Sequence, residues 1–157
     1  MPNDLIIRHL LREEGERLEP YQDHLGFWTI GVGHLIDSRK GGHLPGYIRV
    51  FPITEAQSRV MLRDDVREKR KNLEIALPWL PTLSPTRQCV LLSMAFQMGI
   101  AGLLKFHTTL ARTRRGDYHG ASTSMLSSLW ADQTPNRAAR LSTAMHTGDP
   151  SDLLGII

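Results

Sequence analysis

Length, composition and charge place the chain among ordinary folded proteins. Its 157 residues suit one compact unit, or two small lobes that share a core. With 41% hydrophobic and 22% charged residues, the composition excludes an intrinsically disordered chain. The net charge of +3 comes from residues 77–157. Because no zinc-finger spacing, RNP-type aromatic motif or dense Lys/Arg block accompanies this weak excess, nucleic acid is not expected as the main partner.

Cysteine, histidine and hydropathy patterns narrow the class further. The sequence contains no stretch of about 18 apolar residues and no charged segment followed by an apolar core, so we expect neither membrane insertion nor a signal peptide. Cys89 is the single cysteine and lies in an apolar run, which fits folding in a reducing cytoplasm. It is either a catalytic thiol or a small buried hydrophobe, and the second is usual. The seven histidines lack metal-ligand spacing, so no metal or other cofactor is expected.

A helix that ends in a carboxylate is predicted near the N-terminus. Apolar residues recur with helical spacing over residues 5–11, Asn3 is a suitable N-cap, and Gly15 is a suitable end. Glu14 therefore falls at the helix C-terminus. There the helix dipole opposes ionisation, which helps a carboxyl group keep a proton that it can donate.

An extended segment is predicted over residues 27–34. Alternate residues of such a segment point to opposite faces. One face carries Thr29 with Gly31 and Gly33, and we expect it to be open, so that a bulky polymer could approach the backbone. The other face carries Trp28, Ile30 and Val32 with His34, and its apolar residues should pack inward.

A loop and a long helix follow. Residues 37–52 hold three glycines and two prolines, so we expect a loop with at most a short third strand at 47–51. Thr54 and Gln57 form the pattern of a capping box. The helix that they open, over residues 55–77, is charge-rich with a narrow apolar set, which predicts a long and partly solvated helix.

The remainder of the chain predicts helices only. Ser84 and Pro85 open a helix in which residues 89–98 are polar only at Ser93 and Gln97, so this helix should form the centre of a lobe. Residues 116 and 117 separate two shorter helices. The second of these carries one apolar stripe: Tyr118, Ala121, Met125, Leu129 and Trp130. Pro135 opens a last strong helix that Gly148 closes.

Two carboxylates and a hydroxyl have the spacing E-x8-D-x5-T at Glu14, Asp23 and Thr29. Glycoside hydrolysis needs an acid to protonate the leaving oxygen and a carboxylate to activate water or stabilise the transition state. Three ordinary surface polar groups are the alternative, and this is the usual state of Glu and Asp. The spacing alone does not decide between them.

Residues 12–34, REEGERLEPYQDHLGFWTIGVGH, resemble the catalytic signature of the phage T4 lysozyme family, endolysins that cut the glycan of bacterial cell walls. Further ordered blocks lie at residues 53–66, 96–99 and 133–137, so the similarity spans most of the chain apart from residues 37–52. The resemblance implies a predominantly helical α+β lysozyme-like fold. It implies a small lobe with a helix and a sheet (1–53), a connecting helix (54–77) and a helical lobe (78–157), on which the first helix packs.

The resemblance also implies roles for individual residues. Glu14 would be the general acid of an inverting mechanism, Asp23 would assist the attacking water, and Thr29 would position that water. The implied supporting contacts are Arg137 with Glu14, where the alternative is a solvated arginine, and His34 with Asp65. The second contact makes His34 a structural histidine, which we favour over a metal ligand. The implied substrate-binding positions are Leu35, Phe96, Thr109 and Ser124. Phe96 is equally a candidate for core packing, and the family has Ser and Asn at the last two positions.

The resemblance implies a bacteriolytic phage lysozyme that hydrolyses the β-1,4 bond between N-acetylmuramic acid and N-acetylglucosamine in peptidoglycan. A lytic transglycosylase, which uses one catalytic Glu, and a catalytically silent wall-binding module are the rival interpretations. Asp23 and Thr29 argue against the transglycosylase, and the presence of both carboxylates, Glu14 and Asp23, argues against the binding module. We expect a monomer that stays in the host cytoplasm until a holin or similar factor opens the inner membrane, and that then lyses the cell from the periplasm.

Overall fold

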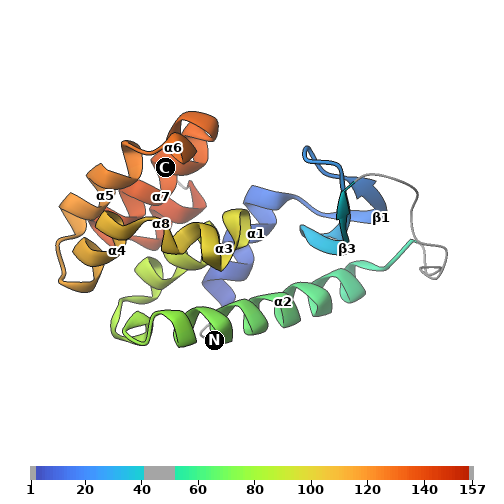
Figure 1. Ribbon diagram of the computed structural model, residues 1–157. Helices are drawn as coiled ribbons and strands as arrows, with labels where there is room; N and C mark the ends of the chain where they lie inside the picture. Colours follow the sequence, from blue (N-terminus) through green and yellow to red (C-terminus); the bar gives the residue numbers. More distant parts are fainter. Residues whose placement is uncertain (1–2, 41–51, 156–157) are drawn as a thin grey trace.

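The computed structural model describes residues 3–40 and 52–155, and it shows two lobes joined by one long helix (Figure 1). A three-stranded sheet makes up the small lobe, and helices make up the large one. The first helix, α1 (Asp4–Glu14), precedes the sheet in the chain but packs against α3 (Pro85–Leu104) and α8 (Pro150–Leu154) of the helical lobe. This is the predominantly helical α+β lysozyme-like fold that the sequence predicts.

α1 has the ends that the sequence predicts. Asn3 is its N-cap residue, and Gly15 ends it in a left-handed conformation (φ 68°) that favours glycine. The Asn3 side chain accepts a hydrogen bond from Nε of Arg70 on α2 (Glu55–Ala76) at 2.8 Å instead of capping its own helix. Ile6, His9 and Leu10 form the buried face of α1. This packing brings Glu14, the last residue of α1, to the boundary between the lobes.

Within the described residues, three antiparallel strands in the order β1-β2-β3 form the sheet: β1 (Arg17–Gln22), β2 (Phe27–Gly31) and β3 (His34–Lys40). The prediction of a loop from residue 37 onward is wrong for residues 37–40, which continue β3. Pairing with β2, as between Lys40 and Phe27, supplies the backbone hydrogen bonds that make a strand of this polar segment. The short strand expected at 47–51 lies outside the described residues.

The extended segment predicted over residues 27–34 is interrupted by a tight turn between β2 and β3. Gly31 and Gly33 both have positive φ, so the chain reverses here and does not continue as one strand. The expectation of an open face is wrong at Thr29, which is 4% exposed. Near Gly31 the sheet is covered by α2, because a Cβ on this glycine would lie 3.1 Å from Oγ of Ser58.

α2 (Glu55–Ala76) joins the lobes and contacts both of them, since it packs on β2 and β3 at one end and on α1 and α3 at the other. The predicted capping box is present: Thr54 Oγ1 accepts from the backbone N–H of Gln57, and the Gln57 side chain accepts from the N–H of Thr54. Its buried residues follow one narrow stripe of Ser58, Leu62, Val66 and Leu73. The other residues of α2 are partly or fully exposed, so they can face either solvent or the space between the lobes.

The helical lobe consists of η1 (Leu80–Thr82), α3 (Pro85–Leu104), α4 (His107–Arg114), α5 (Tyr118–Leu126), α6 (Leu129–Gln133), α7 (Pro135–Thr147) and α8 (Pro150–Leu154). The predicted single stripe across α5 and α6 is wrong, because the helix ends at Leu126 and Leu129 is 70% exposed. Ser128 starts a new helix there by accepting from the N–H of Ala131.

α3 is the central helix of this lobe. It packs against α1, α2, α7 and α8, and residues 89–95 are all buried. Among the described helices it alone has the length and hydropathy of a membrane span, which core helices of folded proteins also have. Burial raises the pKa of the Cys89 thiol to about 12, so the thiolate needed for nucleophilic catalysis does not form near neutral pH. The interpretation of Cys89 as a small buried hydrophobe is the one that fits.

Candidate active site

Glu14 is held at the boundary between the lobes by an arginine from α7. Its Oε1 accepts a hydrogen bond from Nη1 of Arg137 at 3.0 Å, and 25% of the Glu14 side chain remains exposed. Its other oxygen faces the turn between β2 and β3, because a Cβ on Gly33 would lie 3.4 Å from Oε2. Glu14 is thus an oriented and partly exposed acid between the sheet and the helical lobe.

Arg137 links Glu14 to the centre of the helical lobe. Its Nη2 donates to the backbone carbonyl of Ser93 at 3.2 Å and to Oγ of the same residue at 3.0 Å. Arg137 is buried in the first turn of α7, where the helix dipole disfavours a cation. The carboxylate of Glu14 offsets that unfavourable position. The contact implied by the resemblance is therefore present, and a solvated Arg137 is not.

A second ion pair lies beside the first one. Arg140, one turn further along α7, donates from Nε and Nη2 to the two oxygens of Glu13, at 2.7 and 2.9 Å. Burial acts to raise the pKa of Glu13, but the hydrogen bonds and charge of Arg140 outweigh it and hold this pKa below its ordinary value. Two neighbouring carboxylates of α1 are therefore paired with two arginines of α7, which fixes the end of α1.

Asp23 and Thr29 lie at the turn between β1 and β2 and on β2 itself. Oδ1 of Asp23 accepts from the backbone N–H groups of Leu25, at 3.0 Å, and Phe27, at 2.8 Å. The hydroxyl of Thr29 donates to the carbonyl of Phe27 at 3.0 Å. These bonds orient both side chains, and their catalytic roles stay predictions.

Tyr21 is a residue of this region that the sequence analysis missed. It pairs with Thr29 in the β1–β2 ladder. Burial raises the pKa of the Tyr21 hydroxyl, and the charges of Glu14 and Asp23 raise it further. One side chain is therefore within electrostatic reach of both predicted catalytic carboxylates. The sequence signal that could have indicated Tyr21 as a site residue was its position two residues before Asp23, in the strand that pairs with the strand of Thr29.

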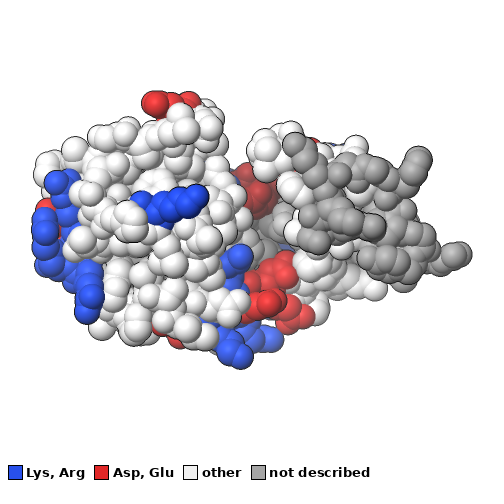
Figure 2. Space-filling view, viewed as in Figure 1, with Lys and Arg blue, Asp and Glu red and all other residues white. Residues whose placement is uncertain are grey.

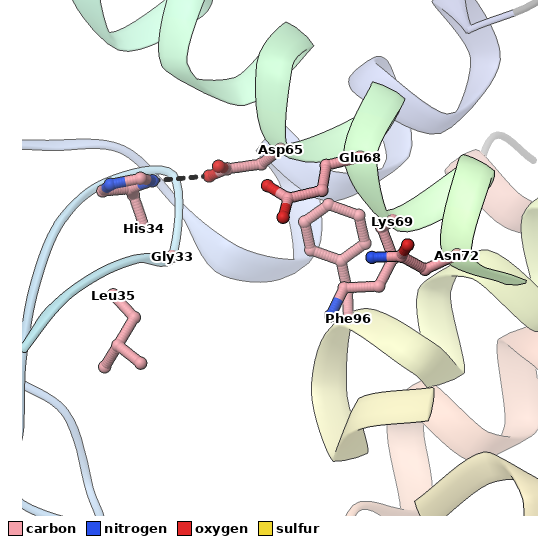
Figure 3. A pocket seen from close by; sticks show the side chains of 8 residues that line it. All are labelled: Gly33, His34, Leu35, Asp65, Glu68, Lys69, Asn72 and Phe96. Atoms are coloured by element: carbon pink, nitrogen blue, oxygen red, sulfur yellow. Dashed lines mark hydrogen bonds and ion pairs between the residues drawn. The ribbon is translucent and has the colours of Figure 1, made fainter. Parts of the chain in front are cut away.

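A cavity of about 350 Å³ lies between the lobes; Glu14 is not one of its lining residues but lies beside Gly33, which is. The space-filling view shows a hollow at this boundary, with acidic side chains in it (Figure 2). The sheet side is lined by Gly33, His34 and Leu35, the α2 side by Asp65, Glu68, Lys69 and Asn72, and the α3 side by Phe96 (Figure 3). Leu35 and Phe96, both predicted binding positions, therefore face the same cavity from opposite lobes.

Of the polar side chains of α2 in this cavity, only Asp65 was predicted as a site residue. Glu68, Lys69 and Asn72 belong to a charge-rich helix whose polar surface is most simply interpreted as solvated. The ammonium nitrogen of Lys69 lies 5.8 Å from the ring centroid of Phe96, within the range of a cation–π contact. The side of the cavity formed by α2 and α3 therefore combines charged, amide and aromatic groups.

His34 and Asp65 form the predicted contact between the sheet and α2. Nδ1 of His34 lies 2.7 Å from Oδ2 of Asp65 (Figure 3). The hydrogen bond that His34 donates to Asp65 raises the pKa of His34 above its ordinary value, against the opposing effect of burial. The pair thus ties the turn at Gly33, which touches Glu14, to the connecting helix.

The pair should stabilise the protein mainly at acidic pH. Because the pKa of His34 is raised in the folded state, its contribution is full below the unfolded pKa of about 6.5 and is lost as pH rises through the folded value. A double-mutant cycle of His34→Asn and Asp65→Asn, measured by urea unfolding, should give a larger coupling energy at pH 5.5 than at pH 8.5. Additivity within about 0.3 kcal/mol at pH 5.5 would show that the two side chains do not stabilise the fold by interacting with each other.

Thr109 and Ser124, the other predicted binding positions, lie together elsewhere. Their hydroxyl oxygens are 2.8 Å apart, and both residues line a second cavity of about 430 Å³. The cavity is also lined by Lys105, His107 and Arg112, and it shares no lining residue with the first cavity. The four predicted binding positions therefore form two separate pairs.

Comparison with known proteins identifies the family. The sequence pattern described as Phage lysozyme matches residues 11–142, which include Glu14, Asp23, Thr29 and Arg137. This chain belongs to the phage lysozyme family. The membership confirms the resemblance seen in the sequence, and it supports a peptidoglycan hydrolase of the lysozyme type.

Relatives of this phage lysozyme family member have different sizes. Over 94% of its length the chain is 33% identical to the pre-baseplate central spike protein Gp5 of Enterobacteria phage T4, but it covers only 28% of that protein. It is 31% identical to the probable T4-type lysozyme 1 of Dictyostelium discoideum, over 90% of the chain and 94% of that protein. It is 31% identical to an endolysin of Acyrthosiphon pisum secondary endosymbiont phage 1, over 71% of the chain and 68% of that protein.

Proposed function

We propose that this chain is a lysozyme that hydrolyses the β-1,4 bond between N-acetylmuramic acid and N-acetylglucosamine in peptidoglycan. The observation that carries the proposal is the position of Glu14. It is oriented by Arg137, partly exposed, and in contact with the turn that lines the cavity between the lobes. A proton donor of a glycosidase needs this combination of fixed geometry and access to the leaving oxygen.

In the proposed reaction Glu14 protonates the glycosidic oxygen, and water attacks the sugar from the opposite face. Asp23 accepts a proton from that water, and its Oδ1 is fixed by two backbone donors. The Thr29 hydroxyl donates its hydrogen bond to the Phe27 carbonyl, so its oxygen lone pairs can accept a hydrogen bond from the water. The two carboxylates and the hydroxyl thus have complementary roles in an inverting hydrolysis.

Sugar binding is assigned to the cavity between the lobes. Leu35 and Phe96 offer apolar surface from opposite sides, and α2 offers hydrogen-bonding groups at Lys69 and Asn72. A saccharide has apolar ring faces and polar edges, so this mixture of groups suits it. Thr109 and Ser124, in the second cavity, would contact parts of the polymer beyond the reacting sugars.

Mass spectrometry of digested peptidoglycan separates the proposal from its rivals. A lysozyme releases muropeptides that end in reducing N-acetylmuramic acid. A lytic transglycosylase releases 1,6-anhydro products, a cut on the other side of the repeat leaves reducing N-acetylglucosamine, and a silent binding module releases nothing. Any of the last three outcomes, obtained with folded protein, would contradict the proposal.

The route to the wall is part of the same proposal. Ile6 and Leu10 are fully buried and lie on the helix that carries Glu14, so this N-terminal segment stays in the active enzyme. We expect the protein to accumulate in the cytoplasm until a holin or another agent opens the inner membrane. In a Gram-negative host, expression alone should be tolerated, and turbidity should fall quickly after the inner membrane is permeabilised. Prompt lysis with an intact inner membrane would contradict this route.

A further inference from the structure

A buried histidine starts a chain of hydrogen bonds that ends on Glu14. His9 is fully buried on α1, and its Nδ1 lies 3.0 Å from the carbonyl oxygen of Leu153 on α8. Its Nε2 lies 2.7 Å from Oγ of Ser93 on α3. The same Oγ lies 3.0 Å from Nη2 of Arg137, whose Nη1 donates to Glu14 at 3.0 Å. This chain of hydrogen bonds thus begins on α1 at His9, passes through α3 and α7, and ends on α1 at Glu14.

The chemistry of the partners sets the direction of each hydrogen bond. A carbonyl oxygen can only accept, so Nδ1 of His9 carries the proton that bonds to Leu153. A guanidinium can only donate, so Oγ of Ser93 accepts from Arg137. The Ser93 hydroxyl is then free to donate its own proton to Nε2, which requires a neutral His9. In an imidazolium both ring nitrogens would be donors, and Oγ would face two donors at once.

The charges around His9 favour this neutral form. Burial is the largest effect and lowers the pKa of His9 below its ordinary value. Arg137 and Arg140 of α7 act in the same direction, whereas Glu13 and the hydrogen bond to Leu153 oppose them. At neutral pH the ring is therefore an acceptor at Nε2 and a donor at Nδ1.

We propose that His9 is a positioning residue for the reaction, acting through Ser93 and Arg137 on the orientation of Glu14. The inference rests on the proposed function, because it assigns His9 to the support of the proposed acid. By accepting the hydrogen bond from the Ser93 hydroxyl, His9 orients that hydroxyl so that a lone pair of Oγ faces Arg137. That contact and the Ser93 carbonyl locate one nitrogen of the guanidinium, and the other nitrogen then meets Glu14.

The third donor of the Arg137 guanidinium, Nε, is left without a partner among the described residues. This atom is buried, and leaving a buried donor unpaired is unfavourable. Arg137 is therefore placed by Ser93 and Glu14 at the expense of its own third donor, as expected of a group whose position serves a site.

Kinetics of two variants test the proposal. His9→Met removes the acceptor at similar volume, and Ser93→Ala removes the hydroxyl but keeps the backbone carbonyl. Each should lower kcat about tenfold, since small misplacements of a reacting group have effects of this order or larger. KM should stay near wild type because His9 is buried and cannot touch the polymer. The double variant should be no slower than the single ones, because both changes break the same chain.

A merely structural histidine would give another result. Substituting it would lower the melting temperature and leave kcat unchanged. If His9 and Ser93 instead acted independently of each other, their effects on kcat would multiply to about a hundredfold in the double variant. Either outcome would overturn the proposal, with folding of each variant checked by circular dichroism. If the wild-type protein released no muropeptides at all, the proposed function would fail instead.

Nitrogen-15 NMR of the wild-type imidazole tests the chain without any activity measurement. At pH 7 the His9 ring should be neutral, with the proton on Nδ1 and none on Nε2. An imidazolium, or a neutral ring protonated on Nε2, would reverse the Ser93 hydrogen bond and overturn the proposal. Because this readout uses no substrate, it separates failure of the chain from failure of the lysozyme assignment.

Discussion

Glu14→Gln is expected to lower wall-lysing activity by at least about a hundredfold, the low end of the contribution of a general acid. The amide has nearly the shape of the carboxyl group but has no proton to transfer to the leaving oxygen. Its oxygen can still accept the single hydrogen bond from Arg137, and the Glu14 side chain is 25% exposed, so the melting temperature should fall less than in a variant that loses the charge of the more buried Glu13. The measurement is the clearing rate of outer-membrane-permeabilised Gram-negative cells, together with thermal unfolding.

Glu13→Gln is the matched control for this experiment. Glu13 precedes Glu14 on α1 and also pairs with an arginine of α7, but only 5% of its side chain is exposed. Losing its charge-assisted bidentate contact with Arg140 should cost about 1–3 kcal/mol of unfolding free energy and should leave activity near wild type. Loss of activity in both variants would assign the effect to the fixing of α1. A Glu14→Gln protein that clears cells at the wild-type rate would show that Glu14 is not the acid.

The helices were predictable because their signals are local. Gly15, the Thr54 capping box and Pro85 each mark a helix end by backbone chemistry that acts within a few residues. The strands were harder to predict. Residues 37–40 are polar, and they form a strand only because β2 offers a partner edge. The turn at Val32 and Gly33 was missed because alternation of apolar residues continues across it.

The residues of the candidate site also differ in whether they could be predicted from local sequence. Glu14, Asp23 and Thr29 lie within one short stretch, so their spacing could be recognised from the sequence. The cavity residues Glu68 and Lys69 could not, because a charged helix face has the same pattern whether it faces solvent or a neighbouring lobe. His9 interrupts an apolar helix face, and only the fold shows that Ser93 and Leu153 satisfy both its nitrogens.

Arg137→Lys should reduce kcat by about tenfold to a hundredfold and lower stability by about 1–3 kcal/mol. Lysine keeps the positive charge but has one nitrogen, whereas Arg137 uses two nitrogens to reach Glu14 and Ser93 in different directions. Arg140→Lys is the control, since it weakens the neighbouring pair with Glu13 at a similar cost in stability and should keep activity near wild type. The comparison separates orientation of the acid from general stabilisation of the contact between α1 and α7. If Arg137→Lys folded normally and kept the wild-type rate, Arg137 would be a structural residue only, and the chain of hydrogen bonds from His9 would have no effect on Glu14.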